Sequence, residues 1–190
     1  MKIFYDVDTQ NDFMNRDGAL YVPGAEEIKP NLKRLTEHAL DNKISLAGSM
    51  DLHFGILEYK EKEGELQKWG GPFPNHCMDR TRGAEKIPET SVNGKGFFFT
   101  KQSYDIFTNR AFEMYLSLYE VQEAVVYGVA TDYCIKAAVV GLQKRGVQCY
   151  VVEDAISGVA PDTTKSALEE MVRAGARFVK TSDVLEGRVI

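Results

Sequence analysis

The chain contains little cysteine and little histidine, with three residues of each type among its 190 residues. A small and odd number of cysteines does not build a disulfide framework, so we expect reduced thiols. No apolar run approaches the roughly 20 residues that a membrane-spanning helix needs. The first residues turn acidic at Asp6 and lack the apolar stretch of a signal peptide. These absences predict a cytoplasmic protein.

Positive charge is also scarce. Lys and Arg number 23 against 28 Asp and Glu, which gives a formal net charge of −5. Nucleic-acid-binding proteins carry a basic surface, and an anionic membrane surface repels an acidic chain. We therefore expect neither nucleic acid nor a membrane as a partner. The sequence leaves open whether the chain forms a homo-oligomer.

The length and the hydrophobic pattern indicate one α/β domain that covers residues 1–190, since a domain averages roughly 150 residues. Short apolar runs typical of buried strands alternate with apolar residues at helical spacing. Strands are predicted at 3–7, 44–48, 97–100, 124–128, 149–152 and 177–180, and helices around 28–39, 112–119, 133–144 and 162–174. This alternation predicts a three-layer αβα architecture, with a mostly parallel sheet covered by helices on both faces.

Residues 49–96 interrupt this alternation. They contain glycines, prolines, several glutamates and two of the three histidines, and they show no regular periodicity. Long irregular segments in compact domains are usually functional or disordered. The aromatic and histidine content of this segment argues against disorder, so we interpret it as functional.

Reactive side chains follow four of the predicted strands. Asp8 ends the first strand, Asp51 and His53 follow the second, Lys101 follows the third, and Cys134 lies shortly after the fourth, at the start of a predicted helix. Ligands bind at the carboxyl ends of the strands in open parallel sheets. We therefore expect these side chains to converge at one edge of the sheet.

Cys134 is the candidate nucleophile. A helix N-terminus and a nearby Lys101 both favour a thiolate, and Asp8 can accept and return a proton. The backbone N–H groups around Ala130 and Cys134 can hold an oxyanion, because first-turn amides lack intrahelical partners. The alternative is that Cys134 packs as a small hydrophobic residue, which is common for a lone cysteine. The presence of Asp8 and Lys101 favours catalysis.

The pattern Asp51-x-His53, together with His76, offers one carboxylate and two imidazoles. These ligands suit Zn²⁺, Fe²⁺ or Mn²⁺ with open positions for water or substrate. A histidine on a loop is more often simply solvated, but two of three histidines within one segment favour a metal. The spacing does not choose a fourth ligand from an acidic run that is otherwise expected to be solvated, namely Glu58, Glu61, Glu63 and Glu65.

The other rare residues receive no catalytic role. Cys77 and Cys149 are interpreted as packing residues, and His38 belongs to the first long helix. Several aromatic residues lie near the reactive groups in sequence. Any of them can be a core residue, but a flat ring substrate would need some of them as walls. These candidates are Phe13, Trp69, Phe73 and Tyr104.

Three segments, residues 8–13 (DTQNDF), 101–107 (KQSYDIF) and 128–134 (GVATDYC), resemble motifs of the isochorismatase-like cysteine hydrolases. They occur in the order of that family, and the resemblance covers nearly the whole chain. It implies a six-stranded parallel sheet with strand order 3-2-1-4-5-6 and a catalytic triad of Asp8, Lys101 and Cys134. It also implies a cis peptide between Val129 and Ala130, which turns backbone N–H groups toward the oxyanion.

Within this family, Asp51-x-His53 and the segment 74–77 (PNHC) resemble the metal site of nicotinamidases. The resemblance implies a metal that holds the pyridine nitrogen of nicotinamide and directs the carboxamide at Cys134. It also places Phe13 and one aromatic before the His-Cys pair beside the ring. The family usually has W-P-x-H-C, whereas this chain has Phe73 at that position and Trp69 four residues earlier. Which aromatic stacks on the substrate therefore stays open.

The expected activity is hydrolysis of nicotinamide to nicotinate and ammonia through a thioester, a reaction of NAD salvage. One alternative is another small amide, such as a carbamoyl or ureido compound or a pyrazinamide-like amide. A second alternative is a binding or scaffold protein without catalysis. A dehydrogenase is disfavoured, because no G-x-G-x-x-G follows the first strand.

Overall fold

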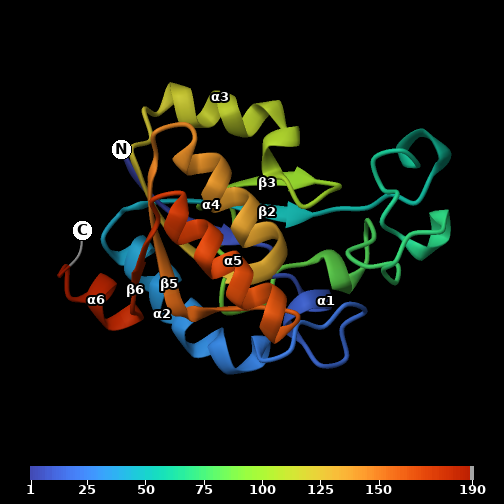
Figure 1. Ribbon diagram of the computed structural model, residues 1–190, viewed down its shortest axis with the longest axis horizontal. Helices are drawn as coiled ribbons and strands as arrows, with labels where there is room; N and C mark the ends of the chain where they lie inside the picture. Colours follow the sequence, from blue (N-terminus) through green and yellow to red (C-terminus); the bar gives the residue numbers. More distant parts are fainter. Residues whose placement is uncertain (189–190) are drawn as a thin grey trace.

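The structure is a computed structural model that describes residues 1–188; the last two residues of the expected domain, 189–190, lie outside this range. Its centre is a six-stranded parallel sheet with the order β3-β2-β1-β4-β5-β6 (Figure 1), which confirms the expected topology. The strands are β1 (Lys2–Val7), β2 (Ser45–Asp51), β3 (Phe97–Lys101), β4 (Glu123–Val129), β5 (Gln148–Ser157) and β6 (Arg177–Val179).

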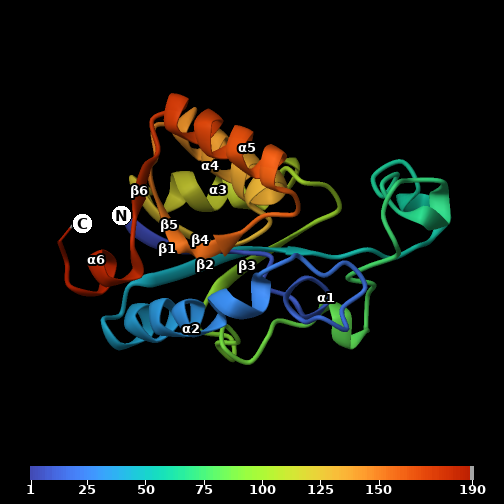
Figure 2. The same cartoon turned by 60° about the horizontal axis from the view of Figure 1, so that its bottom comes forward.

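Helices cover both faces of the sheet (Figure 2). The helices α2 and α6 lie against one face of the sheet, and α3, α4 and α5 lie against the other. Each of the two sets covers one hydrophobic core. On α2, the buried residues Leu32, Leu35 and Ala39 recur at helical spacing, which is why this segment is helical and faces the sheet. The helices are α1 (Asn11–Met14), α2 (Ala25–Asp41), α3 (Arg110–Leu118), α4 (Lys136–Gln143), α5 (Pro161–Arg173) and α6 (Thr181–Leu185).

The two central strands end at the same level and set the position of the site. Val7 of β1 pairs with Ser49 of β2 on one side and with Gly128 of β4 on the other. Gly128 has a φ of 121°, and a Cβ atom there would collide with the carbonyl group of Val7. The glycine therefore permits the close approach of β4 to β1, which brings the residues after both strands together.

Three details differ from the sequence-based expectations. The segment that contains Cys134 begins with a π-helical turn, Thr131–Ile135, before α4, rather than with a regular helix from residue 133. The strand β5 extends to Ser157, beyond the expected end at residue 152, because a register shift against β4 lets the chain continue in the sheet. The short helices α1 and α6 were not predicted, since four or five residues carry too little periodicity to detect.

Residues 52–96 form the irregular segment between β2 and β3. The part of this segment that follows β2 projects away from the sheet in both ribbon views. It contains three short 3-10 helices, Leu57–Tyr59, Gln67–Trp69 and Arg82–Ala84, and it returns to the sheet edge where His53 pairs with Met78. Backbone hydrogen bonds of His53 with Cys77 and Asp79 join the two ends of this excursion.

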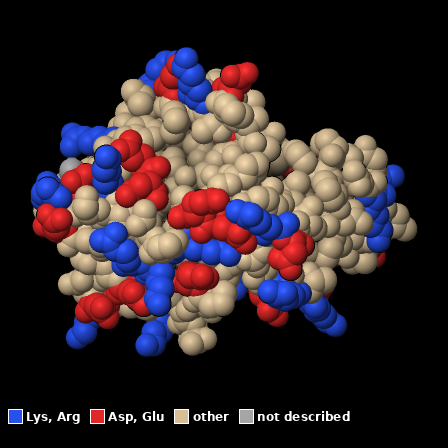
Figure 3. Space-filling view, turned by 90° about the horizontal axis from the view of Figure 1, so that it is seen from below, with Lys and Arg blue, Asp and Glu red and all other residues tan. Residues whose placement is uncertain are grey.

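Within residues 1–188, no helix combines the length and the apolar character needed to cross a bilayer. On the face seen in Figure 3, acidic and basic side chains lie intermixed instead of forming a patch of one sign.

Candidate active site

The structure brings the three expected catalytic side chains together. Asp8 follows β1, Lys101 is the last residue of β3, and Cys134 lies in the π-helical turn after β4. The Lys101 ammonium lies 2.8 Å from Asp8 Oδ2 and 3.4 Å from Cys134 Sγ. All three side chains are buried, and Asp8 and Cys134 line one pocket. The catalytic roles of these residues stay predictions, but their geometry permits them.

The turn after β1 is held from β2. Ser49 Oγ donates a hydrogen bond of 2.8 Å to Asp8 Oδ1, which leaves Asp8 Oδ2 directed to Lys101. The side chain of Gln10 accepts a bond from the Asp51 N–H group and donates one to the Asp51 carbonyl, each 2.7 Å long. The ends of β1 and β2 therefore form one hydrogen-bonded unit.

The protonation of Cys134 differs from the expectation that a thiolate is favoured. Burial raises the pKa of the Cys134 thiol, and although Lys101 acts in the opposite direction, the charges of Asp8 and Asp51 add to the increase. Burial lowers the pKa of Lys101, but the two carboxylates outweigh it and hold the pKa well above its usual value. Without a metal, these surroundings favour a neutral thiol beside a charged lysine.

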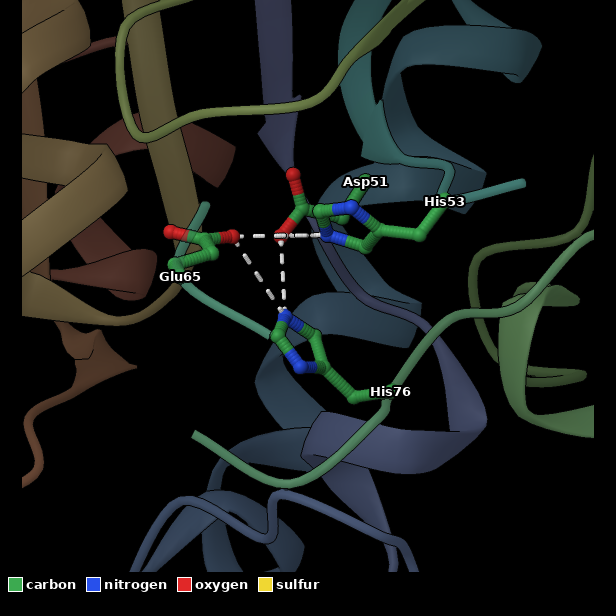
Figure 4. A group of neighbouring side chains, drawn as sticks. All are labelled: Asp51, His53, Glu65 and His76. Atoms are coloured by element: carbon green, nitrogen blue, oxygen red, sulfur yellow. Dashed lines mark ion pairs between the residues drawn. The ribbon is translucent and has the colours of Figure 1, made fainter. Parts of the chain in front are cut away.

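Asp51, His53, Glu65 and His76 form a group of potential metal ligands (Figure 4). One ligand atom from each lies within 4.8 Å of the others. His53 Nε2 is 3.9 Å from Asp51 Oδ2 and 3.4 Å from Glu65 Oε1. His76 Nε2 is 3.6 Å from Asp51 Oδ2 and 3.7 Å from Glu65 Oε1. Two carboxylate oxygens and two imidazole nitrogens thus point at one centre.

The ring nitrogens fit a bound cation. His76 Nδ1 lies 2.7 Å from the Pro74 carbonyl, which can only accept, so Nδ1 carries the proton and Nε2 is free to bind a metal. Both ring nitrogens of His53 are buried without a hydrogen-bond partner, which is costly for polar atoms unless a ligand completes them. Burial lowers the pKa of His53, but Asp51 and Glu65 raise it overall to about 9. The group therefore attracts positive charge, and its donors suit Zn²⁺, Fe²⁺ or Mn²⁺.

The structure identifies which of the four candidate glutamates belongs to the ligand group. Glu65 belongs to the ligand group, whereas Glu58 and Glu61 are exposed. Glu63 is buried, but its carboxylate accepts backbone N–H groups instead of facing the centre of the group. Glu65 reaches the site because the irregular segment, residues 52–96, turns back at this point. The spacing of the glutamates in the sequence does not indicate that turn.

Asp51 joins the ligand group to the triad. Its Oδ1 lies 2.6 Å from Lys101 Nζ, while Oδ2 faces the two histidines. Burial raises the pKa of the Asp51 carboxyl, but Lys101 and the imidazoles outweigh burial and hold the pKa below its usual range. One ionised carboxylate thus belongs to both halves of the site.

Aromatic side chains form much of the pocket wall. Phe13, Phe73 and Tyr104 line the pocket as expected, with the Phe13 ring centroid 5.5 Å from that of His76. Trp69 does not line it: the 3-10 helix that carries Trp69 turns the ring toward the ammonium groups of Lys60 and Lys68. Wall residues that sequence reasoning missed are Leu20, Tyr21, Val22, Tyr133 and Val159. Of these, only Tyr133 had a signal, its position beside Cys134.

The structure also locates the expected cis peptide, the other two cysteines and His38. The peptide bond between Val129 and Ala130 is cis, and Ala130 lines the pocket beside Cys134. Their use as an oxyanion hole stays a prediction. Cys77 and Cys149 are free and buried, which agrees with packing roles, and His38 lies near the end of α2, away from the pocket.

Comparison with known proteins agrees with this geometry. The Isochorismatase domain model matches residues 6–183. The nicotinamidase of Escherichia coli is 29% identical over 202 aligned residues, which cover 93% of each chain. The nicotinamidase/pyrazinamidase of Mycobacterium tuberculosis is 28% identical, with 96% of this chain and 100% of the relative covered. The crystal structure of the pyrazinamidase of Pyrococcus horikoshii in complex with zinc has a TM-score of 0.83 at 28% identity, and the match covers 94% of this chain and 98% of that one. The chain belongs to the isochorismatase family.

Proposed function

We propose that the protein is a metal-containing cysteine amidohydrolase that converts nicotinamide to nicotinate and ammonia. The observation that carries this proposal is the Asp51 carboxylate, which contacts the Lys101 ammonium of the triad and also belongs to the ligand group. The candidate nucleophile Cys134 and three members of the ligand group, Asp51, Glu65 and His76, line one pocket, which supports the proposal. A carboxamide on a nitrogen heterocycle has both of the groups that such a pocket can bind.

The first half of the reaction forms a thioester. The Cys134 sulfur attacks the carboxamide carbon, its proton passes to Asp8, and the backbone N–H groups of Ala130 and Cys134 receive the oxyanion. The C–N bond then breaks, and Asp8 gives the proton to the nitrogen, which leaves as ammonia. Burial raises the pKa of Asp8, although Lys101 opposes the increase, and this suits a carboxylate that holds a proton between the two transfers.

The second half releases the acid. Water attacks the thioester carbon and gives one proton to Asp8. The C–S bond breaks, and Asp8 returns the proton to the Cys134 sulfur while the carboxylic acid leaves. Lys101 keeps its positive charge throughout and balances the charge that moves between Asp8 and Cys134.

Asp51, His53, Glu65 and His76 would hold the metal. When bound, the ion would supply a Lewis acid that can accept the lone pair of a ring nitrogen. The apolar faces of Phe13 and Phe73 suit a flat ring. Zn²⁺, Fe²⁺ and Mn²⁺ all accept this mixed set of oxygen and nitrogen ligands. Zinc has additional support from the related pyrazinamidase structure.

The proposed setting follows from the chemistry. An oxidised Cys134 cannot attack an amide, so the enzyme requires a reducing compartment, such as the cytoplasm. Its partner is the small-molecule amide, and its reaction belongs to NAD salvage. Pyrazinamide is a second candidate substrate, since it has a ring nitrogen in the corresponding place and the Mycobacterium tuberculosis relative carries that activity in its name.

Ammonia release from a panel of amides tests the proposal. We expect release from nicotinamide and pyrazinamide, little from benzamide, which lacks the ring nitrogen, and loss of activity after chelation with recovery on metal addition. A ureido or carbamoyl substrate that is hydrolysed equally well with chelator present would favour the alternative within the family. No release from any amide by metal-loaded protein would contradict the enzyme proposal.

A further inference from the structure

Glu63 is a fully buried carboxylate in an otherwise exposed part of the chain. Its relative exposure is 0%, whereas Glu61 and Lys62 beside it are exposed. A buried carboxylate costs free energy unless hydrogen bonds or a cation compensate it. The contacts of Glu63 therefore indicate why it is buried.

The Glu63 carboxylate contacts His53 and the two residues that follow it. Glu63 Oε1 accepts the Phe54 N–H group at 2.6 Å, and Oε2 accepts the Gly55 N–H group at 2.9 Å. These are the two residues that follow His53. The same Oε1 lies 3.9 Å from His53 Nδ1, and among residues 1–188 His53 is the sole ion-pair partner of Glu63. No lysine or arginine of the described chain compensates this charge.

The two nitrogens of His53 face different carboxylates. Nε2 faces Asp51 and Glu65 within the ligand group, and Nδ1 faces Glu63. Neither nitrogen has a hydrogen-bond partner. A histidine that binds a metal through Nε2 carries a proton on Nδ1, and that N–H group usually donates to a carboxylate or a carbonyl. His76 has such an acceptor in Pro74.

We propose that Glu63 is a positioning residue that accepts the Nδ1–H of His53 and so fixes its tautomer and ring orientation when Nε2 binds the metal. This inference rests on the metal site of the proposed function. The distance of 3.9 Å is longer than a hydrogen bond, so the imidazole must move toward the carboxylate when the ion binds. The backbone bonds to Phe54 and Gly55 hold the carboxylate in place for that contact.

A purely structural role is the competing explanation, because Glu63 also anchors the start of the projecting segment. A neutral acceptor could bind those N–H groups without burying a charge. The position of the carboxylate beside an unpartnered imidazole nitrogen, on the side opposite the ligand group, favours the role at His53.

Metal affinity gives the first test, without any substrate. Metal-free wild-type protein, Glu63→Gln and the control Glu61→Gln are titrated with Zn²⁺ and Co²⁺. Loss of a carboxylate that orients a metal-binding histidine typically weakens metal binding by about 10–100-fold. We expect that loss for Glu63→Gln, together with a changed Co²⁺ absorption spectrum. Glu61→Gln removes the same charge from an exposed position two residues away and should bind as wild type does.

Nitrogen NMR of the wild-type protein gives the second test, which does not depend on the folding of a variant. The chain has three histidines, so the three imidazoles can be assigned individually. In the zinc-loaded protein, we expect His53 to be protonated at Nδ1, with a downfield N–H proton signal. In Glu63→Gln that signal should move upfield, because the anionic acceptor is gone, while the signal of the His76 Nδ1–H should stay in place.

The outcomes separate this inference from the proposed function. Wild-type affinity in Glu63→Gln, or a His53 that binds zinc through Nδ1, would overturn the role of Glu63 even if nicotinamide is hydrolysed. If Glu63→Gln and Glu61→Gln weaken metal binding equally, the effect depends only on the loss of one negative charge. That result would also overturn the role of Glu63 at His53. A wild-type protein that binds no divalent ion would overturn this inference and the metal site together.

Discussion

Asp51 and Lys101 form a buried ion pair in which Asp51 Oδ1 lies 2.6 Å from Lys101 Nζ, while the other oxygen of Asp51 belongs to the ligand group. The charge state of the ligand group is therefore linked to that of the triad. The charge of Asp51 is one cause of the raised pKa of the Cys134 thiol. A divalent cation at the ligand group places positive charge beside Asp51 and acts against that increase.

Metal loading is therefore expected to make Cys134 more reactive. Because the cation lowers the pKa of the thiol, the rate of alkylation by iodoacetamide should rise at lower pH in the loaded protein than after chelation. Mass spectrometry identifies the labelled cysteine. Cys77 and Cys149, which are buried and do not line the pocket, serve as internal controls and should stay unlabelled in both states. Identical pH profiles with and without metal would show that the two halves of the site are not coupled.

Replacement of Asp8 should separate reactivity from turnover. The charge of Asp8 raises the pKa of Cys134, so Asp8→Asn should lower that pKa and speed alkylation at neutral pH. The same substitution removes the group that carries the proton, and ammonia release should fall by at least about 100-fold. Asp17→Asn, which removes an exposed charge, should change neither rate. An Asp8→Asn protein with slower alkylation would contradict this view of the triad.

Cys134→Ala should abolish turnover and preserve the fold. The side chain is small, so its truncation should cost about 1 kcal/mol of the free energy of unfolding. Urea denaturation measures that cost, and ammonia release measures activity. Cys149→Ala makes the same change within β5, where the residue is fully buried and does not line the pocket, and should keep turnover. Near-normal activity of Cys134→Ala would exclude the thioester mechanism.

Metal binding should release a proton near neutral pH. Without metal, the pKa of His53 is raised to about 9, so the imidazole is protonated at pH 7 and must lose its proton before Nε2 binds an ion. Calorimetry in buffers of different ionisation enthalpy should give about one proton released per ion at pH 7 and fewer above pH 9. His38→Ala, on α2, should leave that number unchanged. A release that does not depend on pH would mean that His53 is neutral before binding.

The aromatic wall predicts a specific contrast between two substitutions. Phe73→Ala removes a ring that lines the pocket, whereas Trp69→Ala removes one that does not. We expect Phe73→Ala to raise KM for nicotinamide by about tenfold, which corresponds to about 1.4 kcal/mol, and Trp69→Ala to leave KM near the wild-type value. A larger increase in KM for Trp69→Ala than for Phe73→Ala would show that the irregular segment, residues 52–96, repacks when substrate binds.

Some parts of the site could be predicted because they follow from the ends of the strands. Asp8, Lys101 and Cys134 each come directly or shortly after an apolar run, so a parallel sheet brings them to one edge. Glu65 could not be chosen over its neighbours, since its position depends on how an irregular segment folds back. The prediction that Cys134 favours a thiolate was wrong. The sequence revealed the neighbouring lysine, but it revealed neither the burial of the thiol nor the nearby carboxylate charges that raise its pKa.

The irregular segment between β2 and β3 has a consequence for how the chain can change. Cys134, Asp8 and Lys101 are placed by the sheet, whereas Glu65, His76 and Phe73 are placed by residues 52–96. The proposed nucleophile and the residues proposed to bind the substrate therefore belong to different parts of the chain. If the proposed roles hold, replacement of this segment would change the substrate and keep the nucleophile. Asp51 contacts both Lys101 and the ligand group, so such a replacement could not extend into the end of β2.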